Sequence, residues 1–240
     1  MVASIGDQAV GELRDQGGLW SFQYTPAWLN SPHRYALSPH LPLRAEPLLD
    51  GASVRPVQWY FDNLLPEEGR RTLLASNAKL DAADAFGLLT DYGAESAGSL
   101  TLMPPDEQEA PAGGLRPLPD AALSLRIQQL PRISLAQGAA KRMSLAGAQH
   151  KLAVILQDDV LSEPQGSRPS THILKPEHAG PDYPHSVVNE WFIMRLADRV
   201  GLDVPGVQRR YVPEPVYLIE RFDRVSREGQ VRRLHAIDAC

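Results

Sequence analysis

Aromatic residues at every second position near the start of the chain predict a half-buried strand. Trp20, Phe22 and Tyr24 alternate with polar residues, which is the two-residue period of a strand with one buried face. The aromatic run at 57–61 is also expected to be extended. Leucine stands at both ends of 100–102, and this spacing fits a strand that closes the first structural unit.

Two helices are expected between these strands. The first should begin around Pro66, because proline suits the first turn of a helix. The second should run from residue 81 to residue 89, with Asp81 as its N-cap. Together the strands and helices predict a small α+β domain over residues 1–103.

Residues 104–119 differ sharply in composition from the chain on either side. They hold five prolines, a Gly-Gly pair and three acidic residues, and so offer little to bury. This composition predicts a Pro-rich linker; an ordered loop packed on the second domain is the alternative. A short helix that begins at Asp120 and stops at Pro131 is expected to follow.

Residues 120–240 contain a longer series of apolar runs and turn signals. A loop of small residues leads into the apolar strand Leu152–Leu156, and a second strand, Thr171–Lys175, ends in a lysine. A helix with apolar positions at helical spacing follows. Ser186 is its expected N-cap and Gly201 its expected end.

Two further extended runs, 207–212 and 215–219, lead to Glu-Arg-Phe-Asp-Arg at 220–224. The whole order is that of a protein-kinase N-lobe, in which a strand lysine pairs with a helix glutamate and holds the nucleotide phosphates. Lys175 and Glu190 occupy these two places. The predicted fold class is therefore α+β, with a small N-terminal α+β subdomain followed by a kinase-like N-lobe made of an antiparallel sheet and one helix.

Four motifs stand in order in this second part: Ser144–Gln149 followed by Lys151, Thr171–Lys175, Asn189-Glu190 and Glu220–Arg224. In sequence and spacing they resemble the HipA toxins of bacterial type II toxin–antitoxin modules, a family of serine/threonine protein kinases. The run 61–66 also resembles the N-terminal subdomain of HipA proteins, which implies a role in packing or partner contact. The resemblance covers nearly all of this chain but about the first half of a typical member, so the C-lobe is expected to be absent from it.

The resemblance implies an ATP site. Lys175 should bind the phosphates as a fixed charge, and Glu190 should hold Lys175 in position. Taken alone, Lys175 would be a solvated surface lysine and Phe222 a core aromatic. The other nucleotide-binding residues that the family implies are a loop of small residues and two hinge residues beside the adenine: Ala146, Gly147, Ala148, Glu220 and Phe222.

The most specific hypothesis concerns phosphorylation of Ser144. In the family, a serine at this place in the loop is autophosphorylated, and the modified loop swings out and disrupts the nucleotide pocket. An added charge of about −2 beside a phosphate site would repel ATP. The alternative is an ordinary loop serine that makes local hydrogen bonds.

No residue of this chain is assigned to catalysis. Kinases need a catalytic-loop Asp and Asn and a later metal-binding Asp, whereas every asparagine here precedes Glu220. The run His235–Asp238 follows Glu220 too closely to be a catalytic loop and resembles the start of the first C-lobe helix. The chain is therefore expected to stop inside that helix at Cys240, with the Mg²⁺ ligands beyond it. No His, Cys and Asp cluster has metal-site spacing.

Composition and charge narrow the functions further. The chain has 43% hydrophobic and 22% charged residues, no apolar stretch of membrane-spanning length and no secretory start, so a cytoplasmic protein without a membrane partner is expected. The single cysteine excludes an internal disulfide. A net charge of −5 argues against a strongly nucleic-acid-binding surface. The resemblance implies a DNA-binding antitoxin of the HipB type as partner, with DNA reached only through it.

Three functions are compatible with these observations. The favoured one is the N-terminal part of a HipA-type kinase toxin, which arrests growth by phosphorylating a translation factor such as an aminoacyl-tRNA synthetase and is expected to be inactive as 240 residues alone. The second is a catalytically inactive, short HipA-like module that binds a toxin, an antitoxin or nucleotide. The third is an interaction module with no nucleotide role, in which Lys175→Ala would change nothing.

Overall fold

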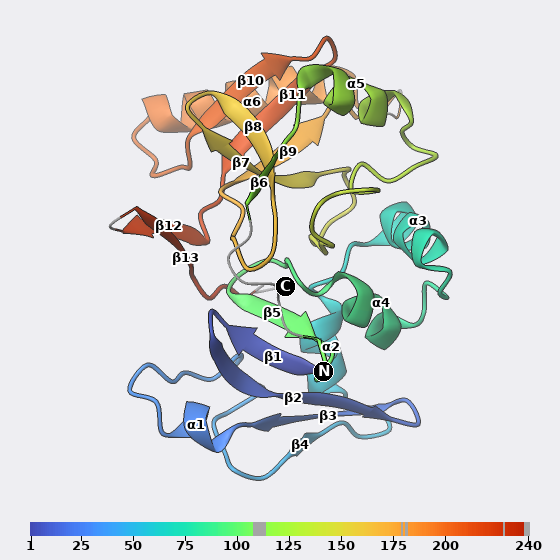
Figure 1. Cartoon of the computed structure of the whole chain (residues 1–240), viewed down its shortest axis with the longest axis vertical. Helices are drawn as coiled ribbons and strands as arrows, with labels where there is room; N and C mark the ends of the chain where they lie inside the picture. The colour runs from blue at the N-terminus through green and yellow to red at the C-terminus, as the bar shows by residue number, and fades with distance from the viewer. Residues whose placement is uncertain (108–113, 179, 181, 228, 238–240) are drawn as a thin grey trace.

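The computed structural model describes residues 1–107, 114–178, 180, 182–227 and 229–237. The chain forms two parts that lie one above the other along the long axis of the molecule, each built around its own antiparallel sheet (Figure 1). A short hairpin and the last described residues run from the second part back to the first.

The N-terminal part is a five-stranded sheet with strand order β4-β3-β2-β1-β5. Its strands are β1 (Val2–Ile5), β2 (Gln8–Gln16), β3 (Leu19–Tyr24), β4 (Leu48–Leu49) and β5 (Leu100–Met103). Its helices are α1 (Pro26–Leu29), α2 (Pro56–Asp62), α3 (Glu68–Ala78) and α4 (Ala85–Tyr92). The strands predicted at 20–24 and 100–102 and the helix predicted to begin near Pro66 are confirmed. Trp20, Phe22 and Tyr24 are all buried in one core.

The run 57–61 was predicted to be extended, and this is wrong, because it lies in α2. The carboxylate of Asp50 accepts the backbone N–H groups of Val57 (2.8 Å) and Gln58 (3.0 Å), which satisfies donors that a helix start otherwise leaves free. Val57 and Phe61 lie one helical turn apart and are both fully buried. Capping from a distant loop and burial at helical spacing therefore outweigh the extended preference of aromatic residues.

The helix expected from Asp81 begins later, as α4, and its N-cap is Asp84. The Asp84 Oδ1 accepts the N–H of Gly87 at 2.9 Å. Asp81 instead caps the preceding turn, where it accepts the N–H of Ala83 at 2.8 Å. The helix that Asp84 caps packs Ala85 into the core.

The second part is a six-stranded sheet with strand order β10-β11-β9-β7-β8-β6. Its strands are β6 (Leu115–Pro117), β7 (Leu152–Gln157), β8 (Val160–Pro164), β9 (His172–Pro176), β10 (Val207–Tyr211) and β11 (Pro215–Glu220). Its other elements are α5 (Asp120–Gln128), α6 (Ser186–Arg199) and the hairpin of β12 (Arg224–Arg227) and β13 (Gln230–Arg233). The strands predicted at 152–156, 171–175, 207–212 and 215–219 are present as β7, β9, β10 and β11, whereas β6, β8, β12 and β13 were not predicted.

The end of the stretch predicted as a linker belongs to this sheet. Leu115–Pro117 pairs with β8, and the Leu118 N–H donates to the Leu161 carbonyl at 2.9 Å. The Arg116 guanidinium also pairs with the buried carboxylate of Glu163. These residues therefore match the alternative of an ordered segment packed on the second part, while 108–113 lie outside the described residues.

Helix α6 differs from its prediction at its start. Its N-cap is His185, in a left-handed conformation, and Ser186 is the first helical residue. The Glu177 carboxylate accepts both the N–H and the hydroxyl of Ser186, so a side chain from another segment serves as the cap. Gly201, at φ +86°, ends the helix as predicted.

Most of the apolar side chains of α6 face solvent. Val187 is its buried residue and packs toward the sheet, whereas Val188, Phe192 and Leu196 are 37%, 55% and 47% exposed. The helix thus covers the sheet with one narrow side and leaves an apolar outer face. No helix among the described residues is long and apolar enough to span a bilayer.

Candidate nucleotide site

The predicted pairing of Lys175 with Glu190 is present. Lys175 lies on β9, in the middle of the sheet, and its Nζ is 2.7 Å from Oε2 of Glu190 on α6. The two side chains are 23% and 30% exposed, so the pair is reachable from solvent. The Lys175 Nζ also lies 5.8 Å from the centre of the Tyr217 ring, on the neighbouring strand. This is the lysine–glutamate arrangement that positions nucleotide phosphates in kinases.

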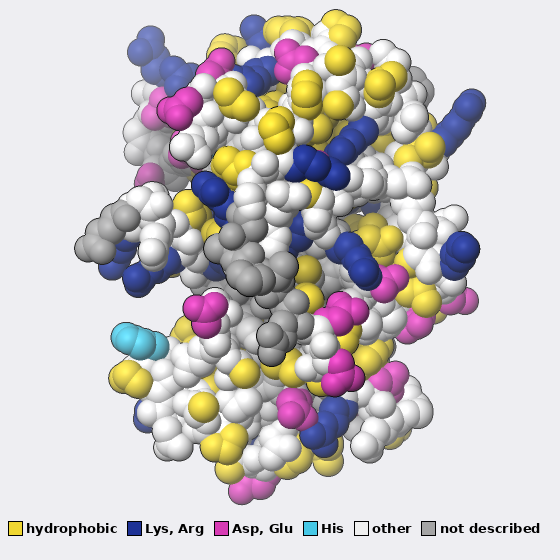
Figure 2. Space-filling view, in the orientation of Figure 1, with side chains coloured by type: hydrophobic (Ala, Val, Ile, Leu, Met, Phe, Trp, Pro, Cys, Tyr) yellow, Lys and Arg dark blue, Asp and Glu magenta, His cyan; other side chains and the backbone are white. Residues whose placement is uncertain are grey.

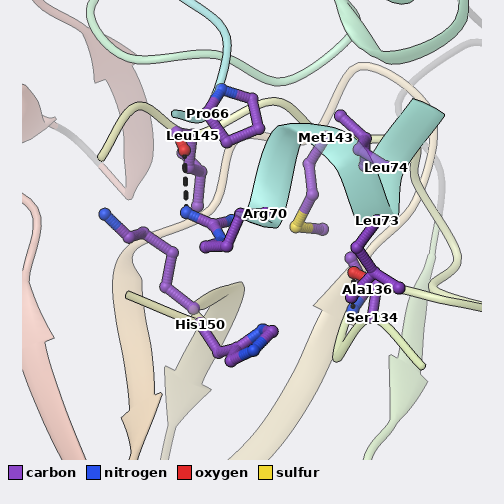
Figure 3. A pocket seen from close by; sticks show the side chains of 10 residues that line it. Pro66, Arg70, Leu73, Leu74, Ser134, Ala136, Met143, Leu145 and His150 are labelled. Carbon is purple, nitrogen blue, oxygen red and sulfur yellow. Dashed lines mark hydrogen bonds between the residues drawn. The ribbon is translucent and has the colours of Figure 1, made fainter. Parts of the chain in front are cut away.

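The loop of small residues is held closed by two cations. Arg70, on α3 of the N-terminal part, donates to the carbonyls of Leu145 (3.2 Å) and Gly147 (2.7 Å). Lys151 donates from its Nζ to the carbonyl of Ala146 at 2.5 Å. Figure 3 shows Arg70 reaching toward Leu145 across a small cavity, with His150 on its other side. Gly147 has φ +93°, a conformation that favours glycine.

Burial lowers the pKa of the basic groups around this cavity. It lowers the pKa of Lys151 to about 8, and the positive charges of Arg70 and Lys175 contribute to this lowering. Burial also lowers the pKa of Arg70 to about 10 and that of His150 to about 4, so Arg70 is charged and His150 neutral at pH 7. Three cations, Arg70, Lys151 and Lys175, therefore converge near the loop with two carboxylates, Glu190 and Glu67. A surplus of positive charge of this kind suits a phosphate ligand.

Sequence reasoning missed Arg70 as a site residue. It precedes Leu145 by 75 residues in the chain, and no periodicity or spacing connects a helix in the first domain with a loop in the second. Lys151 was noted as part of a motif but was not assigned a role. Its place directly after the loop of small residues was the signal that could have identified it.

Ser144 is completely buried in this conformation. Its hydroxyl donates to the carbonyl of Leu64, and its N–H donates to the carbonyl of Glu95 at 2.8 Å. Both acceptors belong to the N-terminal part. Phosphorylation of Ser144 therefore requires the loop to leave its place, and autophosphorylation stays a prediction.

The predicted hinge residues lie at the end of β11. Phe222 is 75% exposed, so the alternative of a core aromatic is wrong. The Glu220 N–H donates to the Gly206 carbonyl at 2.9 Å, and Glu220 is opposite His172 on β9. Since Tyr217 is opposite Lys175, Glu220 lies three residues, or about 10 Å, along the sheet from the lysine at ~3.4 Å per residue. That separation suits a ligand with an aromatic base at one end and phosphates at the other.

The final described residues do not form the expected helix. Residues 234–237 have no regular structure; the remainder of that prediction, 238–240, lies outside the described residues. His235 is held by the N-terminal part instead, with its Nε2 2.9 Å from the Leu37 carbonyl and its ring stacked on Tyr35 at 4.7 Å. These contacts hold the segment against the N-terminal part. Within the described ranges, no group of three or more His, Cys, Asp or Glu side chains could hold a metal ion.

Two family models match the chain, the HipA N-terminal domain over residues 1–103 and the HipA-like C-terminal domain over residues 143–240. The chain belongs to the HipA family. The fold of a solved HipA-family complex agrees: a chain of the Shewanella oneidensis HipA, HipB and operator DNA complex matches with a TM-score of 0.78 and 27% identity, over 98% of this chain and 54% of that chain. This match confirms the predicted α+β class.

Two curated relatives extend this result. The protein named "Putative kinase Y4mE" of Sinorhizobium fredii is 39% identical over 240 residues, which cover 96% of this chain and 56% of that protein. The serine/threonine-protein kinase toxin HipA of Shewanella oneidensis is 30% identical over 243 residues, which cover 98% of this chain and 53% of that protein. The chain thus spans about half the length of the relatives it matches.

Proposed function

We propose that this chain is the nucleotide-binding part of an ATP-dependent serine/threonine kinase of the HipA toxin type. The observation that carries the proposal is the 2.7 Å pair between Lys175 on β9 and Glu190 on α6, because this pair holds the nucleotide phosphates in kinases. The names of two HipA-family relatives, one a kinase and one a kinase toxin, support the same activity.

In this proposal each segment of the site meets one part of ATP. Lys175, with Lys151 and Arg70 near it, would neutralise the phosphates, and the Ala146–Ala148 loop would lie along them. Glu220 and Phe222 would border the adenine. Mg²⁺ would be held mainly by groups outside this chain. We further propose a cytoplasmic protein whose target is a translation factor such as an aminoacyl-tRNA synthetase.

The proposed partner is a DNA-binding antitoxin of the HipB type. The similar solved structure is a complex of HipA, HipB and operator DNA, which supports this assignment. The net charge of −5 favours DNA contact through the partner over contact by this chain itself.

The test is an NMR titration of this chain with ATP, which detects even weak binding. ATP should shift the amide signals of the 145–148 loop, of Lys175 and of Phe222. Lys175→Ala should remove most of this response, and Lys79→Ala, at an exposed lysine on the other part, should not. The absence of any shift with millimolar ATP, or an equal response in Lys175→Ala, would contradict the proposal.

Autophosphorylation is tested by mass spectrometry. In a complete HipA-type kinase that carries this chain, ATP and Mg²⁺ should leave phosphate on Ser144, and Lys175→Ala should abolish the modification. Phosphate found elsewhere, with Ser144 always bare, would rule out this role for the serine.

One observation favours the second function, a catalytically inactive binding module. The outer face of α6 exposes Phe192, Ile193 and Leu196, each close to half, and exposed apolar faces of this kind mark interaction surfaces. A chain that binds a partner through α6 but shows no ATP-induced NMR shifts would support the module and not the kinase.

A further inference from the structure

Glu95, between α4 and β5, is the most heavily paired charge among the described residues. Its side chain is fully buried. Burial alone would raise the pKa of Glu95, but the surrounding cations outweigh it and hold the pKa well below its usual range. Four basic side chains face its carboxylate: Arg233 at 2.6 Å, Arg224 at 2.9 Å, Arg221 at 3.2 Å and Lys141 at 3.5 Å.

The same residue touches both ends of the candidate site. Its backbone carbonyl accepts the N–H of Ser144 at 2.8 Å, at the start of the loop of small residues. Its Oε1 accepts from Arg221 and Arg224, which flank the hinge residue Phe222. One residue of the N-terminal part is therefore bonded to the segment proposed to meet the phosphates and to the segment proposed to meet the adenine.

The hinge is fixed on both sides of Phe222. Asp223 accepts from Arg221 at 2.6 Å and from the Gly98 N–H at 2.7 Å, and both Arg221 and Asp223 are 5% exposed. Ser170 donates to the Glu95 Oε1 at 2.7 Å and lies 3.0 Å from an Arg221 nitrogen that donates to it. The neighbours of Phe222 are thus buried and bonded while its own ring, 75% exposed, is presented to solvent.

We infer that Glu95 is a positioning residue for the adenine end of the nucleotide site. It holds Arg221 and Arg224 so that the hinge backbone and the Phe222 ring keep the geometry in which they receive the base. This role rests on the proposed nucleotide-binding function. It makes the N-terminal part of the chain a component of the site, because preorganised binding groups depend on the shell that supports them.

The chain offers a matched control for a purely structural ion cluster. Glu163 on β8 is also buried and pairs with two arginines, Arg116 and Arg126. It lies three strands away from β11 in the sheet, so it touches neither the hinge nor the loop. Glu95→Gln and Glu163→Gln each remove one buried carboxylate charge, and they differ in whether that charge supports the hinge.

The test measures adenosine and ATP binding to this chain by NMR titration. Glu95→Gln should weaken both ligands by the same factor, about tenfold, since a small displacement of binding groups has an effect of that order. Arg70→Met, which loses the loop contacts and a positive charge near the phosphates, should weaken ATP alone. Glu163→Gln should weaken neither ligand. Wild-type adenosine affinity in folded Glu95→Gln, or equal weakening in Glu163→Gln, would overturn the inference.

A milder variant covers the case in which Glu95→Gln does not fold. Ser170→Ala keeps every charge and removes the hydroxyl bridge between Glu95 and Arg221, and it should weaken adenosine about threefold, the loss of a weak hydrogen bond. Unchanged adenosine affinity in Ser170→Ala would then overturn the positioning role.

Hydrogen exchange tests the positioning role of Glu95 independently of nucleotide binding. The amides of 220–224 should exchange faster in Glu95→Gln or Ser170→Ala than in Glu163→Gln, with or without nucleotide. Equal exchange in the three variants would overturn the positioning role. Failure of the wild-type chain to bind either ligand would instead overturn the proposed function, and the exchange result would still decide what Glu95 does.

Discussion

The two glutamates that pair with basic residues at the candidate site are built very differently. Among the described residues, Glu190 is 30% exposed and forms an ion pair with Lys175 alone, whereas Glu95 is fully buried and pairs with four basic side chains. An exposed pair contributes little to stability and can exchange partners when a charged ligand arrives. A buried pair resists change, because removing one member leaves the others without compensation. Glu190 is therefore suited to interact with a ligand, whereas Glu95 fixes the positions of the groups around it.

The same contrast extends to the two parts of the molecule. Residues 1–103 hold seven basic and twelve acidic residues and therefore carry the whole net charge, whereas residues 104–240 hold seventeen of each. On the face shown in Figure 2, most basic side chains accordingly lie over the second part. The N-terminal part packs its aromatic residues into a closed core, while α6 of the second part leaves an apolar face in solvent. The first part therefore closes around its own core, whereas the second leaves apolar side chains at its surface.

The largest expected effect on stability tests the difference between Glu95 and Glu190 directly. Glu95→Ala should lower the free energy of unfolding by about 3–5 kcal/mol, as for other broken buried ion pairs. Glu190→Ala should lower it by less than ~1 kcal/mol, since that pair is partly solvated. Urea unfolding followed by circular dichroism measures both, and equal losses would remove the distinction.

The next effect compares aromatic residues of the two parts. Phe61 is fully buried between Phe22 and Tyr60, and Phe61→Ala should lower the free energy of unfolding by about 3–5 kcal/mol. Phe192 on α6 is 55% exposed, and Phe192→Ala should change it by within ~0.5 kcal/mol. A large loss for Phe192→Ala in the isolated chain would mean that the outer face of α6 is already covered.

The smallest expected effect is a pH dependence of ATP binding, which tests the proposed role of Lys151 in the second part. Lys151 has a pKa lowered to about 8, so it loses its proton as pH rises through 8, and ATP should bind more weakly above that value. The decrease should approach at most ~10-fold per pH unit for one proton. Lys151→Arg keeps its charge, and its ATP affinity should stay flat from pH 7 to 9.5. An equal decrease in the two proteins would assign the titration to another group.

Local patterns predicted most of the second part. Apolar runs of strand length and the Gly201 stop are found where they were expected. The Lys175–Glu190 pair was predicted because the order of elements is that of a protein-kinase N-lobe, in which a strand lysine pairs with a helix glutamate. Local patterns gave wrong predictions where a side chain from outside a helix caps its start. The Asp50 carboxylate caps α2, which was predicted to be extended, and Glu177 caps α6 at Ser186.

By itself the sequence determined the family, the α+β class, the four strands β7, β9, β10 and β11 and the lysine–glutamate pair, because periodicity, turn residues and short motifs act over a few residues and do not depend on distant contacts. Tertiary structure alone decided that Ser144 is buried beneath Leu64, that Arg70 closes the loop and that Glu95 gathers four cations around the hinge. These contacts join residues from 46 positions apart (Glu95 and Lys141) to 138 positions apart (Glu95 and Arg233). They depend on which polar and charged groups are buried together where the two parts pack, and no local pattern encodes that.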